Sequence, residues 1–232
     1  MGGIVADALH ATPVFADTPP ALVRQIGEEC RLRGFGRGDY VFREGDVGDS
    51  LFIVVDGQVK LQVSSRSGEV AVLTTVGKPD CFGELAFLDG GPRSTSARAL
   101  TDLMLVEIPR ASLLALVQQE PQVLDTLLRI LGERLRRLTE QIADATFLDV
   151  GGRLAKLLLT LANAQHGAPA TDATDLALTQ TDLANMVGGT RQTVNRILAD
   201  LEQRDVIHLD GHVLIIRRPD VLRRRAGMSS TS

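Results

Sequence analysis

The stretch Cys81–Ser96 reads Cys-Phe-Gly-Glu-Leu-Ala-Phe-Leu-Asp-Gly-Gly-Pro-Arg-Ser-Thr-Ser, and it predicts a loop that holds a small anion. Gly83 lets the backbone approach a ligand closely, because it has no side chain. Glu84–Leu88 can form one helical turn whose first N–H groups favour negative charge. Asp89–Pro92 ends that turn, and Arg93 then supplies a forked, permanently charged donor suited to phosphate.

Glu84 and Arg93 together point to a particular kind of ligand. The carboxylate of Glu84 can accept a hydrogen bond from a sugar hydroxyl while Arg93 holds a phosphate, and Ser94 adds a hydroxyl and a backbone N–H. These groups suit a ribose whose hydroxyl and phosphate are neighbours, as in a cyclic nucleotide. The alternative is a Glu84–Arg93 ion pair that only supports a hairpin of a β-barrel.

Composition limits the class of protein. The chain has 232 residues, 44% hydrophobic, with a formal charge of −4, so it can bury a core but has no uniformly basic coat. Only Cys30 and Cys81 are present, which indicates a reducing compartment and no disulfide framework. We find neither a signal peptide nor an apolar run long enough to span a membrane, and we expect a cytoplasmic protein.

Residues 31–110 read as a β-rich domain. Short apolar runs alternate with turns containing Gly and Asp, which is typical of a sandwich or small barrel. The clearest strands are Leu51–Val55, Gln58–Val63, Val70–Leu73 and Leu103–Ile108. A helical lead-in precedes them over residues 1–30, with a helix start at Thr18–Pro20.

Residues 111–147 read as helical, with a break at Pro121. Beyond the break, apolar residues recur in steps of four and three, which is the heptad pattern of a coiled coil. A helix that only covers its own domain would show a wider apolar stripe. We therefore predict a dimer seam made of Leu124, Leu128, Leu131, Leu135, Leu138, Ile142 and Ala145.

Residues 149–232 have the pattern of a winged helix. Thr179 and Asp182 form a capping box at the start of one helix, and Gly188–Gly189 gives a tight turn before a second helix. The sequence Asp210–Gly211 between two apolar runs then indicates a hairpin. An amphipathic helix around Leu154–Leu161 precedes these elements, and a polar loop from His166 to Asp175 separates it from them.

The second helix of this pattern carries polar residues outside its apolar face. Arginine suits guanine and glutamine suits adenine in the major groove, and threonines at helix starts can face phosphates. Residues 179–232 contain eight Arg and six Asp or Glu. The alternative is an ordinary solvated helix face. The predicted DNA-binding residues are Thr179, Thr190, Arg191, Gln192, Asn195 and Arg196.

From about Pro13 to Ile216 the chain resembles the cyclic AMP receptor protein/FNR (CRP/FNR) family of bacterial transcription regulators. The cassette Cys81–Ser96, the run Phe147–Arg153 and the run Val187–Val194 carry the resemblance, in the family's order. The resemblance implies that Arg191 and Arg196 read bases. It also gives an expected ligand-binding set of Phe82, Gly83, Glu84, Leu85, Arg93, Ser94, Thr95, Arg134, Leu138 and Thr139.

Two departures from the family pattern bear on specificity. Leu138–Thr139 stands where the family's cyclic-AMP binders have small polar residues, so both cyclic AMP and cyclic GMP stay open as effectors. Gln192 stands where the family usually has Glu. Because a carboxylate accepts from cytosine and an amide prefers adenine, we expect a two-fold-symmetric operator with a changed base in each half-site.

These inferences predict an α+β chain. We expect an N-terminal β jelly-roll that binds cyclic nucleotides (residues 1–120), a long dimerisation helix (121–148) and a C-terminal winged helix-turn-helix (149–232). The expected function is a homodimeric transcription regulator that binds double-stranded DNA in response to a cyclic nucleotide. The resemblance adds RNA polymerase as a partner. Binding would shift a population of conformers, setting the two recognition helices about 34–36 Å apart.

Other functions remain as alternatives. A regulator of the same architecture could act without ligand or respond to another effector. Two cysteines are too few for an iron–sulfur cluster, and His10, His166, His208 and His212, candidates for haem, are all distant in sequence from the cassette. A cyclic-nucleotide module that controls a partner protein would not need the helix-turn-helix. We find no nucleophile–base pair and no metal cluster, and expect no enzyme.

Overall fold

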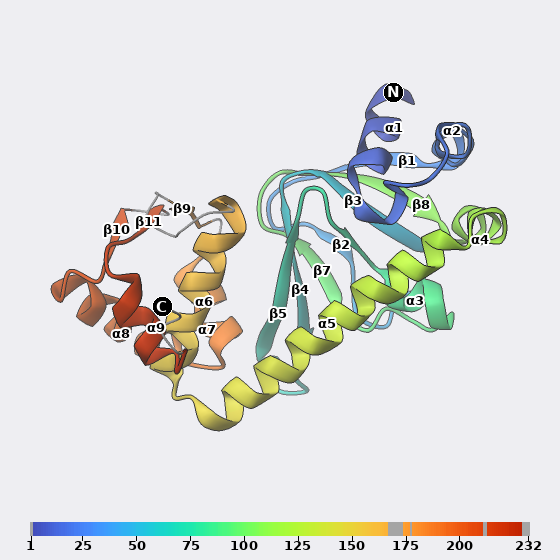
Figure 1. Cartoon of the computed structure of the whole chain (residues 1–232). Helices are drawn as coiled ribbons and strands as arrows, with labels where there is room; N and C mark the ends of the chain where they lie inside the picture. The colour runs from blue at the N-terminus through green and yellow to red at the C-terminus, as the bar shows by residue number, and fades with distance from the viewer. Residues whose placement is uncertain (1, 167–173, 177, 211–212, 229–232) are drawn as a thin grey trace. The chain divides into compact units, whose positions relative to one another are not determined.

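The computed structural model describes residues 2–166, 174–176, 178–210 and 213–228. The chain forms two compact units, Met1–Leu135 and Arg136–Ser232, which meet within one helix. Helices and strands both contribute, so the predicted α+β class is confirmed (Figure 1).

The first unit is built on two four-stranded antiparallel sheets. The strands are β1 (Arg31–Phe35), β2 (Tyr40–Phe42), β3 (Ser50–Asp56), β4 (Gln58–Ser64), β5 (Val70–Gly77), β6 (Cys81–Phe82), β7 (Ser96–Ala99) and β8 (Leu103–Pro109). One sheet has the order β1-β8-β3-β6 and the other the order β2-β7-β4-β5. The four runs predicted as strands all form strands, whereas β1, β2, β6 and β7 had no clear signal in the sequence.

Strand β3 divides the core of this unit in two. Phe52 and Val54 face a cluster between the two sheets, and Leu51 and Ile53 face a second cluster that the helices cover. This follows from the alternation of side chains along a strand. A strand buried on both faces reads as a continuous apolar run, as Leu51–Val55 does.

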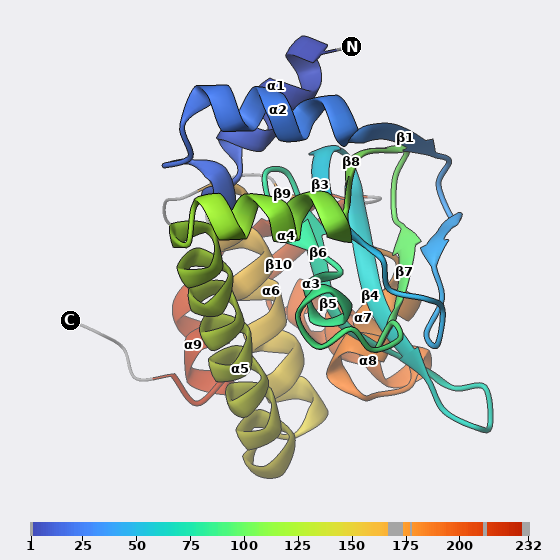
Figure 2. The same cartoon turned by 90° about the vertical axis from the view of Figure 1, so that its right-hand side faces the viewer.

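Helices cover one face of this double sheet (Figure 2). The lead-in contains more structure than the single helix predicted, because the short helices α1 and η1 precede α2. The predicted break at Pro121 separates α4 from α5. These helices are α1 (Gly2–Ala11), η1 (Pro13–Phe15), α2 (Pro20–Glu29), α4 (Arg110–Gln119) and α5 (Gln122–Phe147).

Helix α5 has two apolar faces with different surroundings. Val123 and Leu127 are buried in the core of the first unit, and Ile130 packs against the same core. The predicted seam begins one position further along, on the adjacent side of the helix, and its members Leu135 and Ile142 are 66% and 69% exposed. The described chain therefore leaves this side of α5 largely uncovered.

The second unit contains a helix-turn-helix with a wing. Its first helix is the amphipathic one predicted from the sequence, with Leu154 and Leu158 fully buried. The elements that follow the end of α5 are α6 (Val150–His166), β9 (Thr174–Asp175), α7 (Gln180–Val187), α8 (Arg191–Gln203), β10 (Ile207–Asp210), β11 (Val213–Ile216) and α9 (Pro219–Arg225).

The wing differs in one respect from its prediction. Strands β10 and β11 pair antiparallel as expected, while Gly211 of the predicted turn lies outside the described residues. The polar loop predicted to run to Asp175 is shorter, because Thr174–Asp175 forms a third strand beside β11. Residues 167–173 of that loop also lie outside the described residues.

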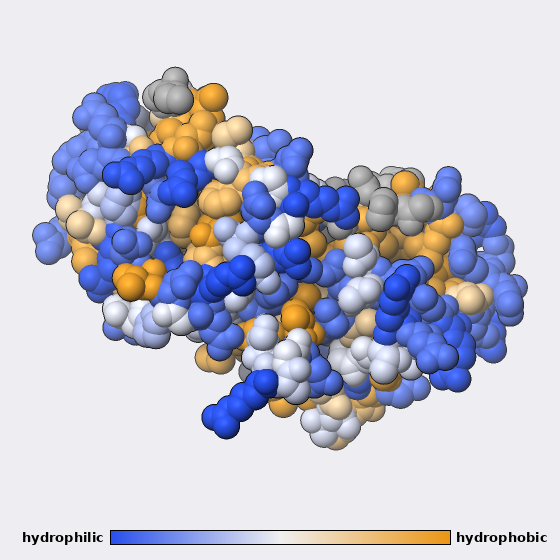
Figure 3. All heavy atoms as spheres, turned by 180° about the vertical axis from the view of Figure 1, so that it is seen from behind, coloured by the Kyte–Doolittle hydropathy of each residue, from blue (hydrophilic) through white to orange (hydrophobic). Residues whose placement is uncertain are grey.

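Polar side chains cover most of the molecular face in Figure 3, with groups of apolar atoms between them. Among the described residues, we find no helix whose length and apolar character would let it cross a membrane.

Candidate nucleotide site and DNA-reading helix

The stretch Cys81–Ser96 folds as a strand, a short helix and a return. Gly83 has φ +85° between β6 and α3 (Glu84–Asp89), and Gly90 has φ +69° after α3, so both positions favour glycine. A Cβ atom on Gly83 would lie 2.6 Å from a guanidinium nitrogen of Arg93. The predicted turn and its termination are therefore present, and Gly83 makes room for Arg93.

Arg93 is turned into the protein. Its two terminal nitrogens donate to the backbone oxygens of Gly83 (2.9 Å) and Ser50 (2.8 Å). Its guanidinium carbon lies 4.3 Å from the ring centre of Phe42 and 5.4 Å from that of Phe52, within range of cation–π attraction. The side chain is thus fixed by two carbonyls and two aromatic rings.

Glu84 is buried and pairs with the long helix. Its Oε1 forms an ion pair with Arg134 of α5, and Arg134 also donates to the backbone oxygen of Cys81. Among the described residues Glu84 pairs with Arg134 and not with Arg93, so the alternative of a Glu84–Arg93 ion pair is wrong. Arg134 instead joins the cassette to α5.

One polar atom of Glu84 and one of Arg93 have no hydrogen-bond partner among the described residues. They are Oε2 of Glu84 and Nε of Arg93, and both are buried. Buried polar atoms in proteins are nearly always hydrogen-bonded, so atoms without a partner at a Gly-rich loop are expected to meet a ligand. An acceptor and a charged donor fit a sugar hydroxyl and a phosphate.

Burial and neighbouring charges also shift the pKa values of three side chains at the site. Burial lowers the pKa of Arg93, while the charges of Asp49 and Glu107 act in the opposite direction. Burial opposes the charge of Arg134 too, but attraction and hydrogen bonding to Glu84 leave its pKa raised. Burial raises the pKa of the Cys81 thiol to about 12, although Arg134 lowers it in part.

The other predicted ligand residues differ in how far they are exposed to solvent. Phe82 is fully buried among Phe42 and Phe52, so its ring is part of the core and only its backbone is available to a ligand. Leu85 and Ser94 are exposed, and Thr95 is half-buried. Leu138 and Thr139 are exposed residues of the second compact unit, and their contact with a nucleotide stays a prediction.

Sequence reasoning missed the surroundings of Arg93. Ser50, Phe42 and Phe52 lie 41 to 51 positions before it in the chain, and no motif links them to it. Alternation along β3 could have placed Phe52 and Val54 on one face. It could not have shown that Arg93 returns over that face.

The helix-turn-helix begins with the predicted capping box. The backbone N–H of Asp182 donates to Oγ1 of Thr179, and the backbone N–H of Thr179 donates to the Asp182 carboxylate, each at 3.1 Å. Thr190 caps α8 by accepting from the backbone N–H of Thr193 at 3.1 Å. Gly188 has φ +61° at the end of α7, which permits the tight turn.

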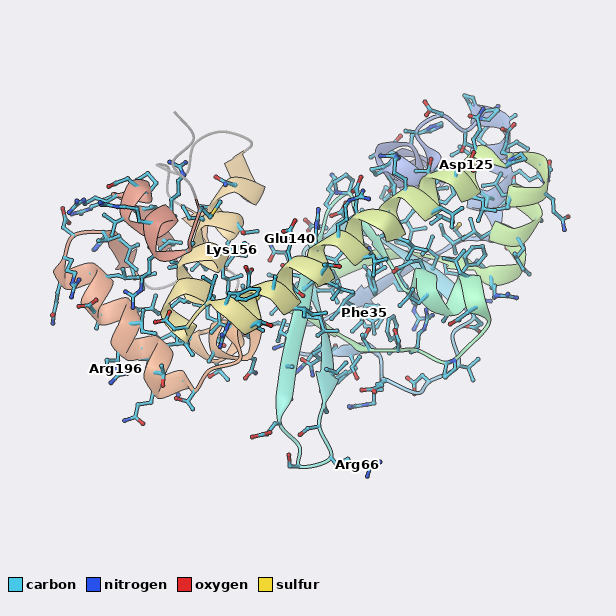
Figure 4. The ribbon with its side chains drawn as sticks, turned by 60° about the horizontal axis from the view of Figure 1, so that its bottom comes forward. Phe35, Arg66, Asp125, Glu140, Lys156 and Arg196 are labelled. Carbon is cyan, nitrogen blue, oxygen red and sulfur yellow. The ribbon has the colours of Figure 1, made fainter. Side chains whose placement is uncertain are left out.

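Helix α8 has the two predicted sides. Its apolar side is buried and consists of Val194, Ile197, Leu198 and Leu201. On the other side Arg191, Gln192 and Arg196 are exposed, and Figure 4 shows Arg196 on α8. Asn195 is only half-buried, and its Oδ1 is buried without a partner among the described residues.

The described residues contain no group of three or more His, Cys, Asp or Glu that could hold a metal ion. Of the histidines considered for haem, His212 and the side chain of His166 lie outside the described residues.

Comparison with protein families agrees with this geometry. Residues 32–120 match the cyclic nucleotide-binding domain, and residues 152–225 match the Crp-like helix-turn-helix domain. The molecule is therefore of the class that joins a nucleotide-binding β-domain to a DNA-binding helix-turn-helix. Within that class the chain belongs to the CRP/FNR family of transcription regulators.

Individual relatives support the family. A CRP-like cAMP-activated global transcriptional regulator of Mycobacterium tuberculosis is 38% identical over 223 residues, which cover 95% of this chain and 99% of the relative. The cAMP-activated global transcriptional regulator CRP of Haemophilus influenzae is 29% identical over 188 residues, covering 81% and 84%. The structure of FixK2 from Bradyrhizobium japonicum, 20% identical, covers 88% of this chain and 99% of its own with a TM-score of 0.77, and shows the shared fold.

Proposed function

We propose that this transcription regulator binds a cyclic nucleotide in the cassette Cys81–Ser96 and responds by changing its affinity for DNA. The observation that carries this proposal is that two buried atoms, Oε2 of Glu84 and Nε of Arg93, have no hydrogen-bond partner in the described part of the chain. A ribose hydroxyl would donate to Glu84, and the cyclic phosphate would bind Arg93. The relatives from Mycobacterium tuberculosis and Haemophilus influenzae are cAMP-activated regulators, which supports cyclic AMP as the effector.

The proposal assigns a role to each part of the chain. Residues 1–120 bind the nucleotide, residues 121–148 form the dimer and residues 149–232 bind DNA. We place the protein in the cytoplasm, where it would meet RNA polymerase. The role proposed for Leu138 and Thr139 is to choose between cyclic AMP and cyclic GMP.

The dimer is proposed from the uncovered side of α5. Leu128, Leu135 and Ile142 are each more than half exposed, and they repeat at steps that fit a partner helix. Exposed leucines on one helix stripe are costly in water, so a second copy would bury them. Sedimentation of the wild type and of Leu135→Glu tests this. A dimer that the substitution converts to monomers supports the seam, and an unchanged dimer contradicts it.

Calorimetric titration with cyclic AMP and with cyclic GMP tests the nucleotide site. Heat of binding in the wild type that disappears in Arg93→Ala would support the cassette as the binding site. A wild type that binds DNA but gives no heat with either nucleotide would contradict it.

One observation favours a second candidate, a regulator that acts without a ligand. Arg93 already donates to two carbonyls, and Glu84 is already paired with Arg134. A protein can use such contacts to hold the cassette in one conformation permanently. DNA binding that is the same with and without nucleotide, in a protein that also shows no heat of titration, would favour this candidate.

A further inference from the structure

A group of arginines follows the wing and is not explained by the recognition helix. Residues 217–225 read Arg-Arg-Pro-Asp-Val-Leu-Arg-Arg-Arg. Five of the eight arginines between residues 179 and 232 lie in these nine positions, with only Asp220 as a negative charge. Without this segment, residues 179–232 would hold three arginines and five carboxylates. The basic surplus of the DNA-binding region therefore comes from this segment.

The segment is held rigidly by helix α9. Leu222 is fully buried and Ala226 is nearly so, and they anchor the helix in the second unit. Among the described elements of this unit, α9 packs most extensively on α6. The last turn then carries Arg223, Arg224 and Arg225. A short helix fixed by its apolar side presents its arginines at a defined place, whereas a tail would not.

The last turn of α9 reaches the first turn of α6. A Cβ atom on Gly151 would lie 2.4 Å from a guanidinium nitrogen of Arg225, so the arginine lies directly on the backbone of α6 there. A Cβ atom on Gly152 would similarly lie 2.9 Å from the backbone oxygen of Arg225. Glycines at both positions allow this close contact.

The same turn of α6 touches the turn of the helix-turn-helix. A Cβ atom on Gly189 would lie 2.9 Å from Cγ1 of Val150. Arg153 donates to the backbone oxygen of Val187 at 2.7 Å, which ties α6 to the end of α7. Arg225 also approaches Asp200, in the third turn of α8, at 3.8 Å, so the last turn of α9 lies beside both α6 and the recognition helix.

The charges at this place are available to a partner. Arg223 is exposed and has no ion-pair partner among the described residues. Arg224 pairs with Asp220 at 3.1 Å in an exposed position, where such pairs contribute little in water. Arg225 approaches Asp200 at 3.8 Å, and that carboxylate is already bound by Arg204 at 2.9 Å.

We propose that the last turn of α9, with Arg223, Arg224 and Arg225, binds the phosphate backbone of the DNA duplex beside the half-site that α8 reads. The inference rests on the proposed DNA binding. Duplex DNA carries about one negative charge per 1.7 Å of its axis, so the backbone next to a bound recognition helix offers phosphates to nearby arginines. Phosphate contacts fix register and raise affinity without reading sequence.

The test compares salt dependence in full-length protein. Binding of Arg223→Gln/Arg224→Gln is measured by fluorescence anisotropy at several salt concentrations, with and without cyclic AMP. One duplex is selected from a random library with the wild type, and one is unrelated. Because Arg225 also packs on α6, it is left intact. The matched control is Arg37→Gln/Arg66→Gln, two exposed arginines of the first unit; Arg66 lies at the tip of the β4–β5 hairpin (Figure 4).

We expect the plot of log affinity against log salt to become shallower by about 0.9 for each lost contact in each protomer. The affinity at about 0.1 M salt then falls roughly eightfold per contact, for both duplexes. The preferred base sequence stays the same, Arg223→Lys/Arg224→Lys keeps the wild-type slope, and the control pair does not change it.

Two outcomes overturn the inference alone. In the first, the wild type binds DNA and the α9 variant has the same slope and affinity. In the second, the variant changes the preferred bases, which would make these arginines readers of sequence. If the wild type binds no duplex at all, the proposed DNA binding fails and the inference fails with it. Unchanged thermal unfolding of the variant excludes a folding defect as the cause of any loss.

Discussion

The nucleotide cassette and the recognition helix both carry charged side chains, but they hold them in opposite ways. In the cassette Glu84 and Arg93 are 3% and 4% exposed. On α8, Arg191 and Arg196 are exposed. The cassette's side chains are fixed by carbonyls, rings and an ion pair, whereas those of α8 project from a helix that is itself held by a buried apolar side.

This difference matches the ligand that we propose for each region. A buried site excludes water and strengthens each electrostatic contact, which suits one small ligand with a fixed arrangement of groups. An exposed helix face can approach the many positions of a long duplex, and its contacts are weakened by salt. Substitutions in the two regions should therefore differ in size and in salt dependence.

The largest effect is expected for Arg93→Ala. The buried charged pair here is Arg93 and the phosphate of the nucleotide. Removing one member of such a pair costs about 2–5 kcal/mol of binding free energy, because the remaining group stays desolvated. We expect the binding free energy measured by calorimetry to weaken by an amount in that range. Arg93→Lys should bind weakly as well, because lysine lacks the planar fork. Wild-type affinity in both variants would contradict the role of Arg93; Arg66→Ala is the control.

A smaller effect is expected for Gln192→Glu on α8. An amide prefers adenine and a carboxylate accepts from cytosine, with about 1–3 kcal/mol of discrimination per base. Selection of binding sites from a random library should show one changed base in each half-site, with nucleotide affinity unaltered. If the variant selects the wild-type sequence, Gln192 does not read a base. Gln203→Glu, at the last position of α8, serves as the matched control.

A third effect concerns the start of the recognition helix. Thr190→Ala removes the hydroxyl that accepts from the backbone of Thr193, and loss of such a cap typically costs about 0.5–2 kcal/mol. Chemical denaturation should show this loss in the free energy of unfolding. Thr190→Ser keeps the hydroxyl and should restore stability. An alanine variant as stable as the wild type would mean that the cap is not needed.

The smallest effect is expected at Cys81. Because the cassette is buried, its thiol should react very little with a thiol reagent. Burial raises the pKa of its thiol to about 12, so very little thiolate exists at pH 8. In a Cys30→Ser variant, a thiol reagent at pH 8 should label the native protein far more slowly than the denatured protein. Equal rates in the two states would show that the cassette is open to solvent.

The sequence was informative where function depends on local patterns. The turn after Gly83, the capping box of Thr179 and Asp182 and the apolar side of α8 are all set by residues within one or two helical turns. The surroundings of Arg93 could not be predicted in the same way. They depend on Ser50, Phe42 and Phe52, which only the pairing of distant strands brings together.

The ion pair between Glu84 and Arg134 was also missed, although the resemblance places both residues in the expected ligand-binding set. Arg134 falls outside the heptad seam, and its sequence position alone does not show which group of the cassette it contacts. No sequence motif marks the segment that forms helix α9, although its arginines contribute to the charge count of residues 179–232. Its position beside α6 depends on Gly151 and Gly152, whose role appears only in three dimensions.

The ion pair between Glu84 and Arg134 has a thermodynamic consequence. Arg134 lies one turn of α5 beyond Leu131 and directly before Leu135, two residues of the proposed dimer seam. A nucleotide hydroxyl that donates to Oε2 of Glu84 would bind the same carboxylate whose Oε1 holds α5 through Arg134. If that shared carboxylate links the nucleotide to the dimer and its hold on DNA, the coupling works in both directions. The factor by which nucleotide tightens DNA binding must then equal the factor by which DNA tightens nucleotide binding.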